Sequence, residues 1–363
     1  MVIPVDLGNR SYSIVVEPGA LASVGTRLRE LRVGSRAVVM TDAAILRAHG
    51  AAVVGGLEAA GLSVSVLEVP EGEAAKTLSV AEHCWDRLLA AGADRTSTIL
   101  ALGGGAVGDL AGFVASTYMR GTNFVPLPTT VLAQVDASIG GKTAIDHPKA
   151  KNLIGAFHQP RLVVVDPSVV LTLPDRDFRS GLAEVVKHGI VLDASYFEDV
   201  ELSVGALIRR DLPTLTRIIG GSCRLKASVI QRDPEEKGEW RFSLNYGHTI
   251  GHALEAATGF DAWTHGEAVS LGIVAEARLA ERLGVGDADT ARRQQALLQA
   301  VGLPTRGARV DTEAVLSAIT HDKKARDGRV PFVLAPSIGA FRVVYDVSPA
   351  DVRAALASIA GAP

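Results

Sequence analysis

The stretch Thr98-Ile-Leu-Ala-Leu-Gly-Gly-Gly-Ala-Val-Gly-Asp109 decides the fold, because it joins an apolar strand directly to a glycine turn. The spacing Gly103-x-Gly105-x-x-Gly108 matches the dinucleotide fingerprint, and a helix is expected over 110–119. Main-chain N–H groups at such a helix start attract phosphate. The acidic residue expected about 20 positions downstream in a strict Rossmann unit is missing. A tight strand–helix turn without a ligand is therefore the alternative interpretation.

The rest of the first half follows the same alternation of β-branched runs with Ala/Leu-rich stretches. Strands are predicted at 13–16, 37–40, 64–69, 98–102, 123–127 and 162–165. This pattern is typical of an α/β domain with a largely parallel, Rossmann-like sheet. Polar residues gather where these strands end, and ligands of such sheets bind beyond the carboxyl ends of strands. We assign residues 1–174 to this α/β domain, in which the glycine turn would form a nucleotide-type phosphate site.

After Leu173-Pro174 the sequence changes from alternating strand and helix patterns to mainly helical patterns. Asp175 and Asp177 supply the acidic residues typical of a first helical turn. Helices are predicted at 180–191, 215–231, 246–257, 265–283, 290–301 and 312–319, with a small hairpin at 332–334 and 341–345. Residues 175–363 are therefore predicted to form a mainly α-helical metal- and substrate-binding domain. The active site is expected in the cleft between the two domains.

Composition excludes several classes of function. The net charge is −3 without a basic block, so binding of nucleic acid is not expected. The sequence contains no run of about 18 uncharged apolar residues, so no membrane span is predicted. A secretory leader is not expected at the N-terminus. Cys84 and Cys223 lack metal-type spacing and are typical of thiols in a reducing cytoplasm.

Several side chains have the chemistry of a metal site. His248 and His252 share one helix face at spacing i, i+4, which suits a divalent cation. His265 follows, and Glu184 lies on an otherwise apolar helix face where a carboxylate needs a partner or a metal. Spacing alone leaves Glu184, His248, His252, His265 and Glu255 as candidates, of which three would bind. A satisfied core histidine is the alternative for each imidazole.

Other polar residues indicate an anionic ligand. Asp42 follows the strand 37–40, where it suits a ribose or a helix cap. Gly140-Gly141 lets the backbone near Lys142 approach an anion. Cationic side chains recur at Lys226, Arg241 and Asp322-Lys-Lys324, so a ligand with carboxylate or phosphate groups is predicted.

Taken together, the motifs resemble the 3-dehydroquinate synthase family over nearly the whole chain. The resemblance rests on ordered motifs, namely Gly103–Asp109, Thr117-Tyr-Met-Arg-Gly121, Pro128-Thr-Thr130, Gln134-Val-Asp136, Gly140-Gly-Lys-Thr-Ala144, Lys151-Asn152, Gly155-Ala-Phe157, Gly181-Leu-Ala-Glu184, Asn245-Tyr-Gly-His248, Gly251-His252, His265-Gly-Glu-Ala268 and Asp322-Lys-Lys324.

The resemblance implies a role for each matching residue. A catalytic Zn²⁺, with Co²⁺ as a possible substitute, would be bound by Glu184, His248 and His265. The NAD site would comprise Asp42, Glu71, Glu73, Lys76, Gly104, Gly105, Gly108, Asp109, Thr129, Thr130, Lys142, Lys151 and Thr172. The substrate would be bound by Asp136, Lys142, Asn152, Lys187, Lys226, Arg241, Asn245, His252 and Lys324 or Lys323. Arg120 resembles the arginine that reaches the phosphate site of a neighbouring subunit, which implies a homodimer.

The implied reaction belongs to the shikimate pathway, which leads to chorismate and the aromatic amino acids, and the implied location is cytoplasmic. The phosphorylated, carboxylated sugar 3-deoxy-arabino-heptulosonate 7-phosphate would yield 3-dehydroquinate and phosphate through transient NAD-dependent oxidation, elimination, re-reduction, ring opening and aldol closure. Asp146 and His188 depart from the residues most frequent in the family, and the resemblance leaves Glu236 and Glu239 as alternatives for one polar role that a single Glu fills elsewhere. The alternatives are another sugar-phosphate cyclase, including one acting on an aminated substrate, a metal-dependent alcohol or glycerol dehydrogenase, and a zinc-stabilised binding module.

Overall fold

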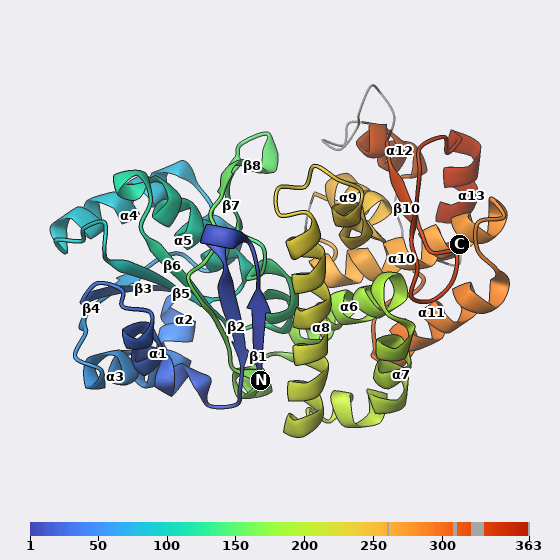
Figure 1. The fold of residues 1–363 in the computed structure, drawn as a ribbon. Helices are drawn as coiled ribbons and strands as arrows, with labels where there is room; N and C mark the ends of the chain where they lie inside the picture. The colour runs from blue at the N-terminus through green and yellow to red at the C-terminus, as the bar shows by residue number, and fades with distance from the viewer. Residues whose placement is uncertain (260, 308–310, 321–329, 362–363) are drawn as a thin grey trace. The chain divides into compact units, whose positions relative to one another are not determined.

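The computed structural model describes residues 1–259, 261–307, 311–320 and 330–361, which group into two compact units (Figure 1). The first unit comprises Met1–Leu173 with Leu215–Glu235, and the second comprises Pro174–Thr214 with Glu236–Pro363.

The first unit is built on a four-stranded parallel sheet in the order β4-β3-β5-β6. Its strands are β3 (Arg36–Thr41), β4 (Ser63–Glu68), β5 (Thr98–Gly103) and β6 (Asn123–Pro128). Every residue of β5 is buried, as expected for a strand covered on both faces. The predicted parallel α/β architecture is therefore confirmed.

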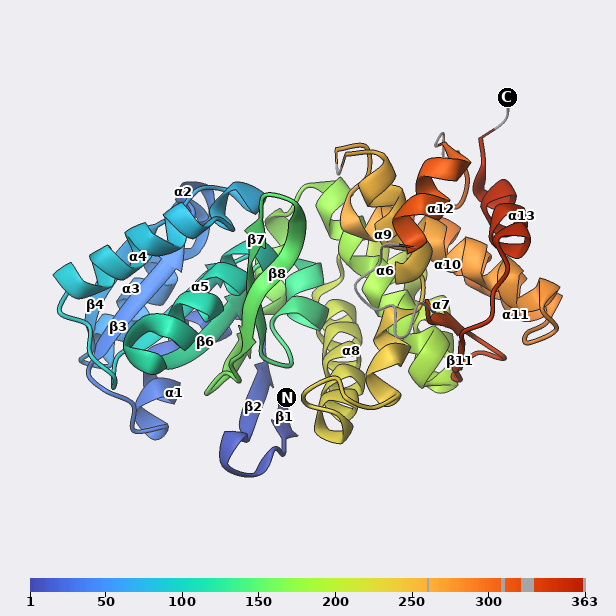
Figure 2. The same ribbon diagram turned by 90° about the horizontal axis from the view of Figure 1, so that it is seen from above.

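Helices and two smaller sheets complete this unit. The helices are α1 (Val24–Glu30), α2 (Ala43–Ile45), α3 (Ala51–Ala59), α4 (Leu78–Ala90) and α5 (Gly105–Thr117), joined by most of α8 (Leu212–Arg232). A second sheet contains β1 (Val2–Val5), β2 (Tyr12–Val16) and β9 (Val163–Val165). The antiparallel hairpin β7 (Lys142–His147) and β8 (Ala150–Phe157) packs against α5 through β7 (Figure 2).

The second unit is mainly helical, as predicted. It contains α6 (Asp175–Leu192), α7 (Ala194–Ile208), α9 (His248–Ala257), α10 (His265–Arg282), α11 (Ala288–Ala300), α12 (Thr312–Thr320) and α13 (Pro349–Ile359). The strands β10 (Phe332–Leu334) and β11 (Arg342–Val344) pair antiparallel, at the place of the expected hairpin. Helix α10 is central, since α6, α9, α11 and α13 all pack against it.

Local sequence explains where the site-bearing helices begin. A capping box between Thr264 and Glu267 starts α10, so that His265 is its first residue. Gly247, with a φ of 77°, precedes α9 and makes His248 the first residue of that helix. The imidazoles of His248 and His265 are therefore each carried by the first residue of a helix. No helix in the described part of the chain has the length and apolar composition needed to cross a membrane.

Candidate metal and nucleotide sites

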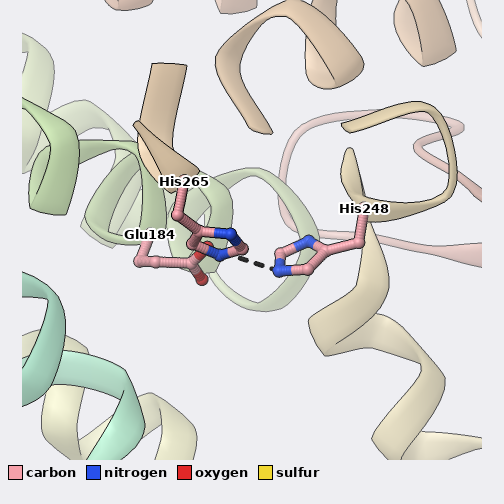
Figure 3. A group of neighbouring side chains, drawn as sticks. All are labelled: Glu184, His248 and His265. Carbon is pink, nitrogen blue, oxygen red and sulfur yellow. Dashed lines mark ion pairs between the residues drawn. The ribbon is translucent and has the colours of Figure 1, made fainter. Parts of the chain in front are cut away.

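Three side chains from three helices of the second unit converge on one point (Figure 3). Nε2 of His248 lies 3.5 Å from Oε1 of Glu184, and Nε2 of His265 lies 3.7 Å from the same oxygen. One ligand atom from each residue lies within 4.8 Å of the other two. Tetrahedral ligands of Zn²⁺, each about 2.0–2.1 Å from the ion, are separated by about 3.3–3.4 Å. The spacing of these three groups therefore suits a small divalent cation.

The orientation of each imidazole is set by its other ring nitrogen. Nδ1 of His248 lies 3.0 Å from the carbonyl oxygen of Tyr246. Because a carbonyl can only accept, Nδ1 donates to it, and Nε2 is the ring atom that faces Glu184 and could bind a metal. Nδ1 of His265 lies 3.5 Å from Oε1 of Glu255. Burial alone lowers the pKa of His265, but the carboxylates of Glu184 and Glu255 outweigh it and raise the pKa to about 10.

A second grouping shares part of this cluster. His252, Glu255 and His265 also have ligand atoms within 4.8 Å of one another. The rings of His252 and His248 are 5.1 Å apart, and those of His252 and His265 are 5.9 Å apart. All five residues that spacing left open as ligands therefore lie together, and His265 belongs to both groupings.

Lys187 lies beside the cluster and is buried with it. Its ammonium pairs with Glu184 one helical turn away and donates a 2.7 Å hydrogen bond to the carbonyl oxygen of Leu244. Both side chains are inaccessible to solvent. Buried charges of this kind persist only when they are paired and hydrogen-bonded, so Lys187 compensates the charge of Glu184 in the second unit.

In the first unit, the carboxyl ends of the parallel strands bring several predicted cofactor residues to one edge. Asp42 follows β3, Glu71 follows β4, Gly104 follows β5 and Thr129 follows β6. The register pairs Thr41 with Glu68 and Gly103 with Pro128, so these ends are level. A pocket at this edge is lined by residues that include Gly104, Gly105, Gly108, Ala137 and Lys142.

The glycine turn leaves the start of α5 open. Gly104 is the N-cap and provides no side-chain hydrogen bond, so first-turn N–H groups of α5 face the turn. A Cβ on Gly104 would lie 3.3 Å from Thr130, and one on Gly108 would meet nothing within 4 Å. Thr129 Oγ1 is buried and has no hydrogen-bond partner in the described structure. The start of α5 therefore has no side-chain cap, and the hydroxyl of Thr129 at the neighbouring strand end has no partner among the described residues.

Lys76 is the centre of an ion cluster beside this turn. Its ammonium donates to Asp109 Oδ2 at 2.8 Å and to Asn152 Oδ1, and lies 3.8 Å from Glu73. Burial lowers the pKa of Lys76, but the carboxylates of Asp109 and Glu73 outweigh burial and raise it. Burial raises the pKa of Asp109, although Lys76 opposes this shift. Asp146 closes the cluster, accepting from the N–H of Asn152 at 2.7 Å.

Other predicted cofactor residues have mainly local contacts. Oδ1 of Asp42 accepts from the N–H groups of Ala44 and Ile45 at 2.9 Å, so this residue caps α2. Thr130 Oγ1 accepts from Ala133 N–H, and Thr172 donates to Val169. The exposed Glu71 makes no side-chain cap bond, and Lys151 lies on β8.

The predicted substrate residues divide between the two units. In the first unit Lys226 donates to both Oδ1 and the main-chain oxygen of Asp136 at 2.5 Å. In the second unit Arg241 is buried, and Asn245 Nδ2 is buried without a hydrogen-bond partner in the described structure. Arg120 is exposed, with a φ of 65°. Lys323 and Lys324 lie outside the described residues.

The hairpin that carries Lys142, Lys151 and Asn152 was not predicted from the sequence. The strand β7 does not alternate between buried and exposed residues, since Thr143, Ala144 and Ile145 are all buried while Lys142 is exposed. Its partner β8 is largely exposed, so its sequence lacks the alternation of apolar and polar residues that predicts a strand. Asn152 in β8 also has a φ of 53°, which is unusual for a strand residue. The hairpin matters because it brings Asn152 to Lys76.

Solved structures with this fold define the class of protein. The chain superimposes on 2-epi-5-epi-valiolone synthase from Streptomyces hygroscopicus subsp. jinggangensis, solved with NAD⁺ and Zn²⁺ bound, with a TM-score of 0.89, 27% identity and 98% coverage of both chains. A 2-deoxy-scyllo-inosose synthase complexed with carbaglucose-6-phosphate, NAD⁺ and Co²⁺ gives 0.88 and 26% identity over 98% of this chain and 99% of that one. A probable glycerol dehydrogenase from Sinorhizobium meliloti shares the fold alone, with a TM-score of 0.67, 18% identity and 95% coverage of both chains. The fold is that of the sugar-phosphate cyclases.

Sequence comparison narrows this class. The 3-dehydroquinate synthase N-terminal model matches residues 66–180, and the C-terminal model of the same family matches residues 181–325. A curated 3-dehydroquinate synthase from Desulforamulus reducens is 43% identical over 98% of this chain and 99% of its own length. Another from Geobacter metallireducens is 47% identical over 94% of this chain and 95% of its own. The chain belongs to the 3-dehydroquinate synthase family.

Proposed function

We propose that the chain catalyses the 3-dehydroquinate synthase reaction, a carbon–oxygen lyase reaction that converts 3-deoxy-arabino-heptulosonate 7-phosphate to 3-dehydroquinate and phosphate in the shikimate pathway. The observation that carries the proposal is the convergence of Glu184, His248 and His265 in a member of this family. A carboxylate and two imidazoles form a common catalytic Zn²⁺ donor set with a position left for substrate. On metal binding, His265 would release the proton that its raised pKa retains.

The donor set fits a metal on chemical grounds. Glu184 is inaccessible to solvent, and the hydrogen bond from Nδ1 of His248 turns Nε2 of this ring toward it. When bound by Glu184, His248 and His265, Zn²⁺ or Co²⁺ supplies a Lewis acid that lowers the pKa of a substrate hydroxyl. Lys187 holds the carboxylate of Glu184 in place, and Glu255 orients His265 through Nδ1.

The glycine turn fits a dinucleotide. Uncapped N–H groups at the start of α5 suit a diphosphate, and the unpartnered Thr129 hydroxyl adds a donor at the neighbouring strand end. NAD supplies a hydride acceptor that later returns the hydride, so the reaction has no net redox change. Oδ1 of Asp42 accepts hydrogen bonds from the main chain of α2, so a ribose hydroxyl would donate to the other carboxylate oxygen, Oδ2.

The remaining polar residues suit an anionic sugar. Lys142 is exposed at the start of β7, and Asp136 holds Lys226 in one orientation. Arg241 and Asn245 supply buried donors in the second unit, and a guanidinium matches a carboxylate through two parallel hydrogen bonds. We assign these residues, with Asn152, Lys187 and His252, to substrate binding.

A homodimer and a cytoplasmic location complete the proposal. The left-handed backbone at Met119 and Arg120 presents both side chains to solvent, as a residue that reaches a second subunit requires. Cys84 and Cys223 are free, buried thiols, which is consistent with a reducing compartment. Light scattering during gel filtration tests the dimer, and a monomeric mass would exclude it.

The activity is tested by phosphate release from 3-deoxy-arabino-heptulosonate 7-phosphate with catalytic NAD⁺. We expect release that a chelator abolishes and Zn²⁺ restores, without accumulation of NADH. Sedoheptulose 7-phosphate and glucose 6-phosphate, which lack the carboxylate, are the matched control substrates. Faster turnover of either control would identify a different sugar-phosphate cyclase, and stoichiometric NADH would identify a dehydrogenase.

A further inference from the structure

The start of α9 is capped by a side chain from another helix. Gly247 is the N-cap and has no side chain to satisfy the first-turn N–H groups. Glu276, fully buried on α10, accepts from the N–H of Gly247 at 2.6 Å through Oε2 and from the N–H of Ile250 at 3.2 Å through Oε1. A carboxylate at a helix N-terminus is also favoured by the helix dipole. Glu276 therefore supplies in trans the cap that Gly247 lacks.

Close contact between α9 and α10 makes this cap possible. A Cβ on Gly272 would lie 1.9 Å from the carbonyl oxygen of Gly247, and one on Gly247 would lie 2.5 Å from Ile273 Cγ1. A Cβ on Gly251 would lie 3.1 Å from the carbonyl oxygen of Ala268. The glycines allow the two backbones to approach. Glu276 follows Gly272 by four residues and thus shares its helix face.

The two hydrogen bonds lie on either side of His248. Gly247 precedes this residue and Ile250 follows it by two positions, so one carboxylate fixes the main chain around the imidazole. The preceding residue, Tyr246, supplies the carbonyl that accepts from His248 Nδ1. A shift of the main chain at Gly247 would move both the Cα of His248 and the acceptor that orients its ring.

We propose that Glu276 is a positioning residue for the metal centre, acting through the start of α9 to orient Nε2 of His248. This inference rests on the proposed function, because it assigns His248 as a metal ligand. Residues that orient metal ligands through hydrogen bonds typically change metal affinity by about 10–100-fold when they are mutated. In this role Glu276 acts through the main-chain N–H groups of Gly247 and Ile250, so its effect on the metal is indirect.

The test compares Zn²⁺ affinity of the full chain and of Glu276→Gln, measured by competition with a chromophoric chelator. In the variant, the NH₂ group of glutamine replaces one carboxylate oxygen of Glu276. Two donors then face each other, so one hydrogen bond is lost while the side-chain volume is kept. We expect Kd for Zn²⁺ to rise about 10–100-fold, with a changed visible absorption spectrum of the Co²⁺-substituted protein. Ser270→Ala is the matched control, since Ser270 is also buried on α10 but donates to Pro304. Its Kd should stay within twofold of the parent.

A parent protein that binds no Zn²⁺ would contradict the proposed function. A parent that binds Zn²⁺, together with an unchanged Kd and Co²⁺ spectrum in folded Glu276→Gln, would overturn this inference alone. Hydrogen exchange on the unmutated protein covers the case in which the variant does not fold. First-turn amides of a helix normally lack an intrahelical acceptor and exchange fast. Because Glu276 accepts from the N–H groups of Gly247 and Ile250, these two amides are expected to exchange slowly. Exchange at the rate of an open helix end would also overturn the inference.

Discussion

Replacing Lys76 with methionine should destabilise the first unit in a way that depends on pH. The Lys76 side chain is 3% exposed, and its ammonium lies 2.8 Å from Asp109 Oδ2. Breaking a buried ion pair by removing one partner costs about 3–5 kcal/mol. Because the Asp109 side chain is 23% exposed, we expect a smaller loss of about 2–4 kcal/mol at pH 8.

The sign of the pH dependence follows from the pKa of Asp109. Burial raises this pKa in the folded parent, and Lys76 opposes the rise. Removing Lys76 raises it further, so the folded variant binds a proton at a pH where the unfolded chain does not. The stability of the variant relative to the parent must then increase as the pH falls toward the raised pKa of Asp109. Lys76 remains protonated throughout this range, since its own pKa is raised.

Urea unfolding of the parent and the variant at pH 8 and pH 5.5 measures the effect. The double variant Lys76→Met, Asp109→Asn should recover part of the loss, because it removes the uncompensated carboxylate. Arg27→Met is the matched control, since Arg27 pairs with Glu17, whose side chain is 53% exposed. Such exposed pairs contribute about 0–1 kcal/mol. A loss below about 1 kcal/mol for Lys76→Met, or one independent of pH, would refute the assignment of a buried, coupled cluster.

Two further predictions concern the second unit. Gly272→Ala should lower the free energy of unfolding by about 1–3 kcal/mol, because its Cβ would lie 1.9 Å from the Gly247 carbonyl oxygen. Gly55→Ala on α3 of the first unit is its control, since open space surrounds that position and a gain of up to about 1 kcal/mol is expected in chemical unfolding. An equal response of the two variants would contradict the close approach of α9 and α10. His265→Ala should lose most bound metal by emission spectroscopy and most turnover, while its circular dichroism stays that of the parent. Full metal content and activity in that variant would exclude His265 as a ligand.

Local patterns in the sequence were sufficient to predict the parallel sheet and most helices. Each strand of β3–β6 is an apolar run that ends in turn residues, so its type and the edge at which Asp42 and Thr129 lie follow from nearby sequence. Helix α5 begins at Gly105, five residues before the predicted 110, because the glycine turn itself enters the helix. Helix α7, with Asp193 capping its start, was not predicted at all.

The choice among ligands depended on information that spacing does not contain. Helical periodicity places His248 and His252 on one face, but it cannot tell which imidazole meets Glu184 from another helix. That choice depends on the direction in which α6, α9 and α10 cross, and the crossing depends on glycine contacts between α9 and α10. Glu276 was missed for the same reason, because a buried glutamate on an apolar helix has no local partner in the sequence.

The two candidate sites share one electrostatic solution to the problem of a buried charge. In the first unit Lys76 is held by Asp109 and Asn152, and in the second Lys187 is held by Glu184 and the Leu244 carbonyl. A lysine that had to be desolvated only when an anionic ligand arrived would weaken binding by the full desolvation penalty. Here the fold already compensates both ammonium groups, so a ligand that bound beside either one would meet a lysine that is already desolvated and oriented. The same compensation requires that each carboxylate partner be retained, which is why Asp109 and Glu184 should tolerate substitution less well than their exposed neighbours.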